Sequence, residues 1–124
     1  MMNGTNSYKD LIVWRKSIDL VTELYKLTKK FPKEEIYGLT SQMRRSAVSI
    51  PSNIAEGSNR GTKKDYVQFL RIAYGSGAEL ETQLVISKKI QETKSLDYKT
   101  VDLLLDEVMR MLNAMIRKLS RPNP

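Results

Sequence analysis

The 124-residue sequence contains no cysteine and no histidine. Without cysteine the chain cannot form a disulfide or use a thiolate, which suits a reducing cytoplasm, and we expect the protein to be cytoplasmic. Without histidine it lacks the commonest general base, the Ser–His and Cys–His catalytic pairs, and histidine-dependent metal sites. No apolar run is long enough to span a membrane. These absences do not exclude a carboxylate or lysine base, but no pattern points to one. We expect no enzymatic activity, no catalytic residue, no cofactor, no metal and no membrane association.

Positive charge is present in excess. The chain has 21 Lys and Arg against 14 Asp and Glu, a formal net charge of +7. Such an excess favours nucleic acid or another anionic partner, although it also serves ordinary solubility. The acidic residues Asp102, Asp106 and Glu107 lie close together in sequence, but on the polar side of a predicted helix. They indicate a solvated face rather than a metal site.

Four segments have apolar residues at three- and four-residue steps, the period of an α-helix. The predicted helices cover about residues 11–30, 37–58, 63–90 and 97–120, and Thr62 is a suitable N-cap for the third. Short connections between long helices favour antiparallel neighbours. We expect a single all-α domain, an up-down-up-down antiparallel four-helix bundle over residues 11–120, with a flexible leader at 1–10 and a tail at 121–124.

Apolar positions exceed what one bundle needs to bury. The first predicted helix has one apolar face at Leu11, Trp14, Ile18, Val21 and Tyr25, and a second line at Val13, Leu20, Leu24 and Leu27. Further apolar positions lie on the third helix at Val67, Tyr74, Ala78 and Val85, and on the fourth at Leu103 and Ala114. A broadly packed bundle could absorb them, but left in water they would form large exposed patches. We expect a homo-oligomer.

A polar line runs beside the apolar face of the second predicted helix. It comprises Gln42, Arg45, Ser49, Asn53 and Glu56, and the third helix offers Ser76 and Glu79. Partly buried polar groups need hydrogen-bond partners. We therefore expect a structural polar network in which Arg45 meets Glu56, Glu79 or both, bridged by Ser49 and Asn53.

Pro51 and the small residues of the third helix disturb regular helix packing. Pro51 lacks a backbone donor, which predicts a kink in the second helix. Gly75 and Gly77 lower helix propensity, and the close approach of another backbone would offset that cost. A notch for a small ligand near Glu56 and Glu79 remains an alternative use of this space.

Basic residues gather at the predicted turn between the second and third helices. Arg60, Lys63 and Lys64 lie there, beside helix amides that favour a phosphate. Arg110, Arg117, Lys118 and Arg121 follow the outer side and end of the fourth helix. Our candidate nucleic-acid-binding residues are Arg44, Arg60, Lys63, Lys64, Arg71, Arg110 and Arg117.

Three stretches carry a family resemblance: YKDLIVWRKSIDLVTELYKLTKKFP, GLTSQMRRSAVSIPSNIAEGSNRGTKKDYVQFLRIAYGS and ELETQL. They resemble the bacterial four-helix-bundle proteins encoded in intervening sequences of 23S ribosomal RNA genes, which are similar in turn to the accessory variability proteins of diversity-generating retroelements. The resemblance implies pentameric rings with basic surfaces and no enzymatic activity. It marks Arg45, Ser49, Asn53, Glu56, Gly57, Gly75, Ser76 and Glu79 as signature positions, whereas Gly77 stands where a larger apolar residue is expected.

Residues and resemblance together predict a non-enzymatic, basic, oligomeric accessory protein, expected to be a pentamer, that binds the phosphate backbone of RNA or DNA. The first alternative is a protein-interaction scaffold, for example for a reverse transcriptase or a ribosome-associated partner. The second, less favoured, is a small-ligand-binding bundle. Salt-dependent binding to nucleic acid would distinguish the first reading from the other two.

Overall fold

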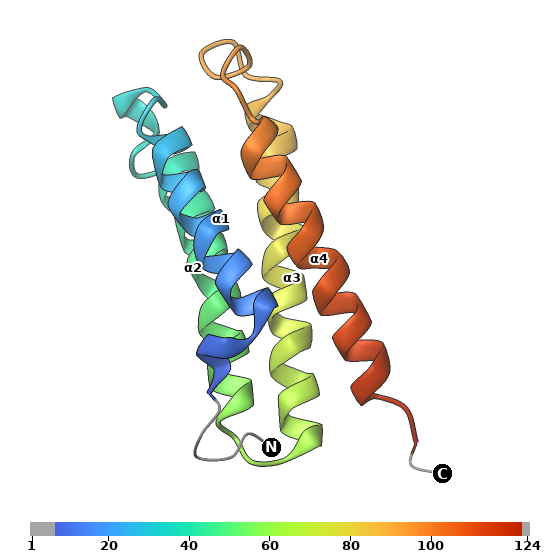
Figure 1. Ribbon diagram of the computed structural model, residues 1–124. Coiled ribbons are helices and arrows are strands. Elements are labelled where there is room, and N and C mark those ends of the chain that lie inside the picture. The colour runs from blue at the N-terminus through green and yellow to red at the C-terminus, as the bar shows by residue number, and fades with distance from the viewer. Residues whose placement is uncertain (1–6, 123–124) are drawn as a thin grey trace.

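The computed structural model describes residues 7–122, which form four α-helices, two 3-10 turns and no strand. The helices are α1 (Ile12–Thr28), α2 (Leu39–Ser58), α3 (Lys63–Ser87) and α4 (Lys99–Leu119), and the turns are η1 (Tyr8–Asp10) and η2 (Lys33–Glu35). Both α1 and α3 pack against α2 and α4, and consecutive helices run in opposite directions along the long axis (Figure 1). The predicted all-α bundle is therefore confirmed. Within the described residues no helix is long and apolar enough to cross a membrane.

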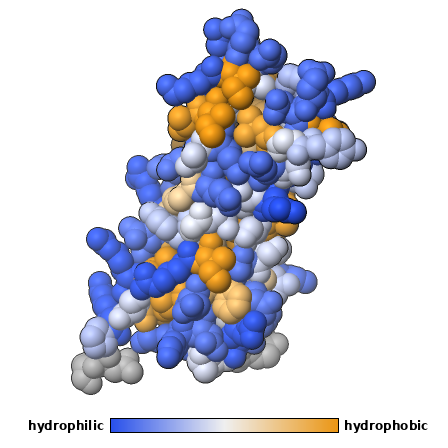
Figure 2. Space-filling view, turned by 180° about the vertical axis from the view of Figure 1, so that it is seen from behind, coloured by the Kyte–Doolittle hydropathy of each residue, from blue (hydrophilic) through white to orange (hydrophobic). Residues whose placement is uncertain are grey.

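The α1 helix turns its second apolar line to the core. Val13, Leu20, Leu24 and Leu27 are buried, whereas Ile18 and Tyr25 are 37% and 40% exposed. Both lines have helical spacing, so periodicity alone could not decide between them. The other residues of the first apolar face, Leu11, Trp14 and Val21, are partly buried and flank the core. Figure 2 shows apolar patches left among polar residues on one outer face of the bundle.

The α2 and α3 helices form the most extensive helix pair, and Gly57 lets them approach closely. A Cβ atom at position 57 would lie 2.7 Å from the Cβ of Phe69 and 3.1 Å from the ring of Tyr66. Burial beneath this contact raises the pKa of the Tyr66 hydroxyl above its ordinary value. Gly77 faces α4 instead, and the Met109 side chain fills the space that a larger residue would need. The glycine is therefore matched to Met109.

The α2 helix is continuous through Pro51, from Leu39 to Ser58. The Ser52 hydroxyl donates to the Val48 carbonyl at 2.8 Å, and the Asn53 amide donates to the Ser49 carbonyl at 2.8 Å. Neither bond reaches the Ala47 carbonyl, which is the acceptor that Pro51 leaves without a backbone donor. The kink near Pro51 stays a prediction.

Part of the predicted leader has regular structure. Ser7 caps η1 through a reciprocal pair of hydrogen bonds with the turn, and the Tyr8 ring packs edge-on against Trp14 with centroids 5.3 Å apart. These contacts hold η1 on the start of α1. Residues 1–6 of the predicted leader and 123–124 of the predicted tail lie outside the described residues.

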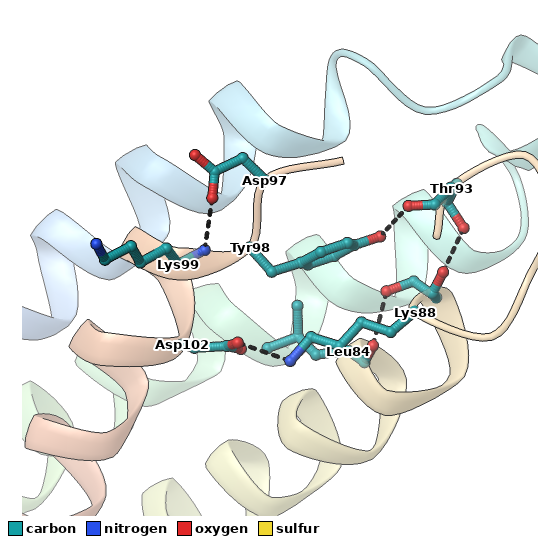
Figure 3. Close-up of polar contacts among 8 residues, drawn as sticks. Leu84, Lys88, Thr93, Asp97, Tyr98, Lys99 and Asp102 are labelled. Carbon is teal, nitrogen blue, oxygen red and sulfur yellow. Dashed lines mark hydrogen bonds and ion pairs between the residues drawn. The ribbon is translucent and has the colours of Figure 1, made fainter. Parts of the chain in front are cut away.

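The connection between α3 and α4 is fixed by buried hydroxyl groups (Figure 3). The Thr93 hydroxyl donates to the Ser87 carbonyl at 2.6 Å, and the Tyr98 hydroxyl donates to the Thr93 carbonyl at 2.9 Å. Lys88 pairs with Asp102 at 2.6 Å across the same region. Thr93 and Ser87 are fully buried, so the connection is part of the packed bundle rather than a loose loop.

The three acidic residues of α4 that lie close in sequence have separate basic partners. Asp102 pairs with Lys88, Asp106 with Arg110 and Glu107 with Lys16. Lys88 follows directly on α3 and Lys16 lies in α1, so Asp102 fastens α4 to the end of α3 and Glu107 fastens it to α1. Such half-exposed pairs contribute little each, about 0–1 kcal/mol.

Candidate nucleic-acid interface

The turn between α2 and α3 is built by Gly61 and Thr62. Gly61 has a φ of +94°, a left-handed conformation that suits glycine. Thr62 then caps α3, because its hydroxyl accepts a hydrogen bond from the Asp65 amide at 3.1 Å. The N-cap predicted at Thr62 is therefore confirmed. The chain reverses tightly and presents Lys63 and Lys64 on the first turn of α3.

Arg60 is held in place on this turn. Its guanidinium pairs with Glu56 one helical turn earlier at 3.2 Å and lies 4.9 Å from the centre of the Phe69 ring. The carboxylate neutralises part of its charge, and the ring limits its motion. Arg60 therefore fixes the shape of the turn as well as adding charge to it.

The end of α4 lies close to the turn between α2 and α3. The Arg71 guanidinium donates to the Ser120 hydroxyl at 3.3 Å, a contact between residues 49 positions apart. Beside it lies an open cleft of about 310 Å³ between the start of α3 and the end of α4, lined by Lys63, Lys64, Val67, Gln68, Leu119 and Ser120. Arg117 and Lys118 lie on the last turn of α4, next to this cleft in sequence and at the same end of the bundle.

These segments together make a surface that we call the basic end, in the lower part of Figure 1. It comprises Arg60, Lys63, Lys64, Arg71, Arg117, Lys118 and Arg121, all exposed. The same stretches, 56–71 and 117–121, contain only two acidic residues, Glu56 and Asp65. Lys64, Arg117, Lys118 and Arg121 make no ion pair with any residue that the structure describes. Their positive charge is therefore not neutralised by an ion pair within residues 7–122.

Two of the seven candidate residues lie elsewhere. Arg44 is at the other end of α2, where it is half-buried and donates to the Thr28 hydroxyl at 2.9 Å. Arg110 lies about two helical turns before Arg117 and pairs with Asp106 at 3.0 Å. The basic end thus gathers Arg60, Lys63, Lys64, Arg71 and Arg117 but not these two.

The polar network between α2 and α3 is smaller than expected, because Arg45 takes no part in it. The Ser49 and Ser76 hydroxyls are 2.8 Å apart, and the Asn53 amide donates to the Ser49 hydroxyl at 2.9 Å. Ser46, which sequence spacing assigned to the apolar face, donates to Glu79 at 3.2 Å.

The prediction that Arg45 pairs with Glu56 or Glu79 is wrong. Arg45 is exposed and has no hydrogen bond or ion pair to the described part of the chain, while Glu56 pairs with Arg60 instead. The polar line of α2 runs along the edge of the contact between α2 and α3. Its short side chains, Ser49 and Asn53, are half-buried there. The longer Arg45, Glu56 and Glu79 side chains extend into water.

The sequence did not predict the contacts at this site between residues that lie far apart in the chain. The Arg71–Ser120 hydrogen bond had no signal, because nothing local in sequence relates the middle of α3 to the end of α4. Lys118 and Arg121 could be seen as basic residues ending a helix. The predicted up-down topology already sends this helix to the end of the bundle that holds the α2–α3 turn, and the folded chain adds the contact itself.

Fold and surface define a small four-helix protein with one strongly basic end. In a comparison with protein families, residues 9–114 match the family described as 23S rRNA-intervening sequence protein. The match covers most of the 124 residues, so the chain belongs to this family. A search of curated proteins found no match.

Proposed function

We propose that this protein is a non-enzymatic, cytoplasmic accessory protein that binds the phosphate backbone of nucleic acid through its basic end. The observation that carries the proposal is the meeting of the α2–α3 turn with the end of α4. The two stretches that meet there, 56–71 and 117–121, carry seven basic residues and two acidic ones, Glu56 and Asp65. Exposed, uncompensated cations attract phosphates and release condensed counterions when they bind.

The chemistry of the basic end favours contacts to phosphates over contacts to bases. Lys63 and Lys64 lie on the first turn of α3, where the helix dipole adds to the attraction for an anion. Arg117, Lys118 and Arg121 extend the positive surface along the end of α4. Flexible lysine and arginine side chains of this kind position a nucleic acid without reading its sequence.

Self-association is the second part of the proposal. Large apolar side chains stay exposed on the bundle, among them Ile72, Val85, Ile86 and Leu103. We propose that copies of the chain cover part of this surface in a homo-oligomer, a pentamer by resemblance to the ring-forming relatives. Each added copy brings another basic end, so weak phosphate contacts would act together.

Neutralising part of the basic end tests the nucleic-acid proposal. We expect the triple variant Lys64→Gln/Arg117→Gln/Arg121→Gln to bind a fluorescent duplex at least about tenfold more weakly near 0.1 M salt, because three phosphate contacts are lost. The slope of log affinity against log salt should fall by up to about 2.7, since each contact contributes about 0.9. Fluorescence anisotropy over a salt series measures both quantities.

The matched control is Lys30→Gln/Lys89→Gln/Lys94→Gln, which removes the same charge from exposed lysines at the other end of the bundle. This variant should keep most of the wild-type affinity. Equal losses in the two triple variants would show that net charge, not the basic end, determines binding. Wild-type protein that shows no salt-dependent binding to either DNA or RNA would overturn the proposal.

A protein-interaction scaffold is the second candidate, favoured by the same exposed apolar residues that suggest self-association. The relation of this family to the retroelement accessory proteins stays a prediction, and so does a reverse transcriptase as the protein partner. A protein partner held by apolar contacts would bind with little dependence on salt. The salt series therefore separates the two candidates.

A further inference from the structure

We infer that a second binding site, distinct from the basic end, lies in the cavity between the α1–α2 connection and the first turns of α2. It would take a small molecule that joins one anionic group to a compact apolar group. The cavity has a volume of about 280 Å³ and is lined by Thr28, Lys29, Phe31, Pro32, Lys33, Ile36, Thr40 and Arg44. It lies at the opposite end of α2 from Arg60, so it goes beyond the proposed function.

Arg44 is the residue that points to an anion. Its Nε donates to the Thr28 hydroxyl at 2.9 Å, and its guanidinium carbon lies 4.4 Å from the centre of the Tyr25 ring. The Thr28 hydroxyl in turn donates to the Leu24 carbonyl at 2.9 Å. These contacts hold the guanidinium in one orientation and leave its terminal N–H groups without a hydrogen-bond partner in the described chain. An oriented guanidinium with free terminal donors matches the paired oxygens of a carboxylate or phosphate.

The charge around Arg44 is unbalanced. Lys29 and Lys33 also line the cavity, and none of the lining residues is acidic. The carboxylate of Glu35, in the same connection, accepts a hydrogen bond from the Leu39 amide at 3.2 Å and caps the start of α2. No described carboxylate pairs with Arg44, so its charge is free to attract an external anion.

Thr40 supplies an independent observation. Its side chain is buried, yet its hydroxyl has no hydrogen-bond partner among the described residues. Buried hydroxyls without partners are uncommon, and each needs an explanation. Thr40 lines the same cavity as Arg44, but its hydroxyl oxygen is closed to solvent, so a ligand oxygen would reach it only after a local side-chain shift.

The walls of the cavity define the rest of the ligand. Phe31 is buried, and Pro32 and Ile36 add an apolar surface on the same connection. The volume is slightly below the usual range for ligand pockets, about 300–1,000 Å³, which limits the ligand to one small ring or a short aliphatic group. The shared chemistry is a carboxylate or a phosphate monoester attached to such a group.

Isothermal titration calorimetry with benzoate and phenyl phosphate tests the site and distinguishes the two anions. We expect one of them to bind once per chain, and inorganic phosphate and benzyl alcohol to bind at least about tenfold more weakly, because each lacks half of the required chemistry. Arg44→Gln should weaken binding at least about tenfold. Arg110→Gln, which removes an exposed arginine paired with Asp106, should leave binding unchanged.

Two further variants keep the test decisive if Arg44→Gln does not fold. Lys33→Gln and Thr40→Val each alter the cavity without removing the Arg44–Thr28 contact, and each should weaken binding several-fold. The Lys64→Gln/Arg117→Gln/Arg121→Gln variant should bind the probe normally, which separates this site from the basic end. Absence of saturable binding to wild-type protein, or binding that persists in the cavity variants, would overturn the inference. Inorganic phosphate binding as tightly as phenyl phosphate would also overturn it.

Discussion

At the scale of single residues, three glycines within helices have different surroundings. Gly57 lies against Phe69 and Tyr66, Gly77 lies against Met109, and Gly75 has no atom within 4 Å of where a Cβ would stand. Only the first two have a packing reason within one chain. Helical glycine costs about 1 kcal/mol relative to alanine, so Gly75 lowers stability without a contact that explains it.

Alanine substitutions separate these cases. Gly57→Ala should lower the free energy of unfolding by about 1–3 kcal/mol, because the new methyl group would collide with the Cβ of Phe69, which cannot move without shifting α3. Gly75→Ala should raise it by about 0.5–1 kcal/mol, because the backbone is already helical and the space is open. Urea denaturation followed by circular dichroism measures both. Equal effects of the two substitutions would contradict the packing argument.

At the scale of helices, the sequence predicted each α-helix but neither 3-10 turn, and not every face. The four helices followed from apolar spacing, and Thr62 marked the start of the third. The inward face of α1 did not, because its two apolar lines have the same period. Only packing against α2 and α4 decides between them, and that information is not local to α1.

The α3–α4 connection shows the same limit. The sequence predicted only a gap between the helices at residues 91–96, and the structure buries Thr93 completely within it. A hydroxyl that satisfies a carbonyl several residues away leaves no periodic signal in the sequence. The composition of the connection therefore could not predict that it has a fixed, packed structure.

Removing one hydroxyl tests the connection. Tyr98→Phe should lower the free energy of unfolding by about 1–2 kcal/mol, because the ring stays packed while the Thr93 carbonyl loses its donor. Tyr37→Phe is the control, since Tyr37 is 95% exposed and should change stability by less than about 0.5 kcal/mol. Thermal and urea denaturation of both variants provide the measurement. A Tyr98→Phe protein as stable as the control would show that the hydrogen bond contributes nothing.

At the scale of the whole molecule, the basic end could be predicted in part. Arg60, Lys63 and Lys64 are contiguous, so their clustering was visible in the sequence. Arg71 and Ser120 are brought together by the fold alone. Arg44 and Arg110 were included because they are basic, and their partners Thr28 and Asp106 place them elsewhere.

Assembly is the prediction that belongs to this scale. We expect sedimentation velocity to give a mass that is a multiple of 14.3 kDa, with five copies as the proposed number. Ile72→Glu/Ile86→Glu should shift the protein toward one copy without unfolding it, because both side chains are 46% exposed and apolar. Thr22→Glu/Ser41→Glu, at exposed polar positions of α1 and α2, is the control for added charge. A wild-type protein that sediments as one copy at every concentration would contradict the proposal.

The path of the chain has a practical consequence. The described chain enters the bundle at η1 and leaves it after α4, and both points lie toward the end that contains the α2–α3 turn (Figure 1). An affinity tag joined to either terminus would therefore hang beside the surface proposed to meet nucleic acid, where a polyhistidine or acidic linker could imitate or screen its charge. Tag-free protein is the material on which its affinity for nucleic acid should be judged.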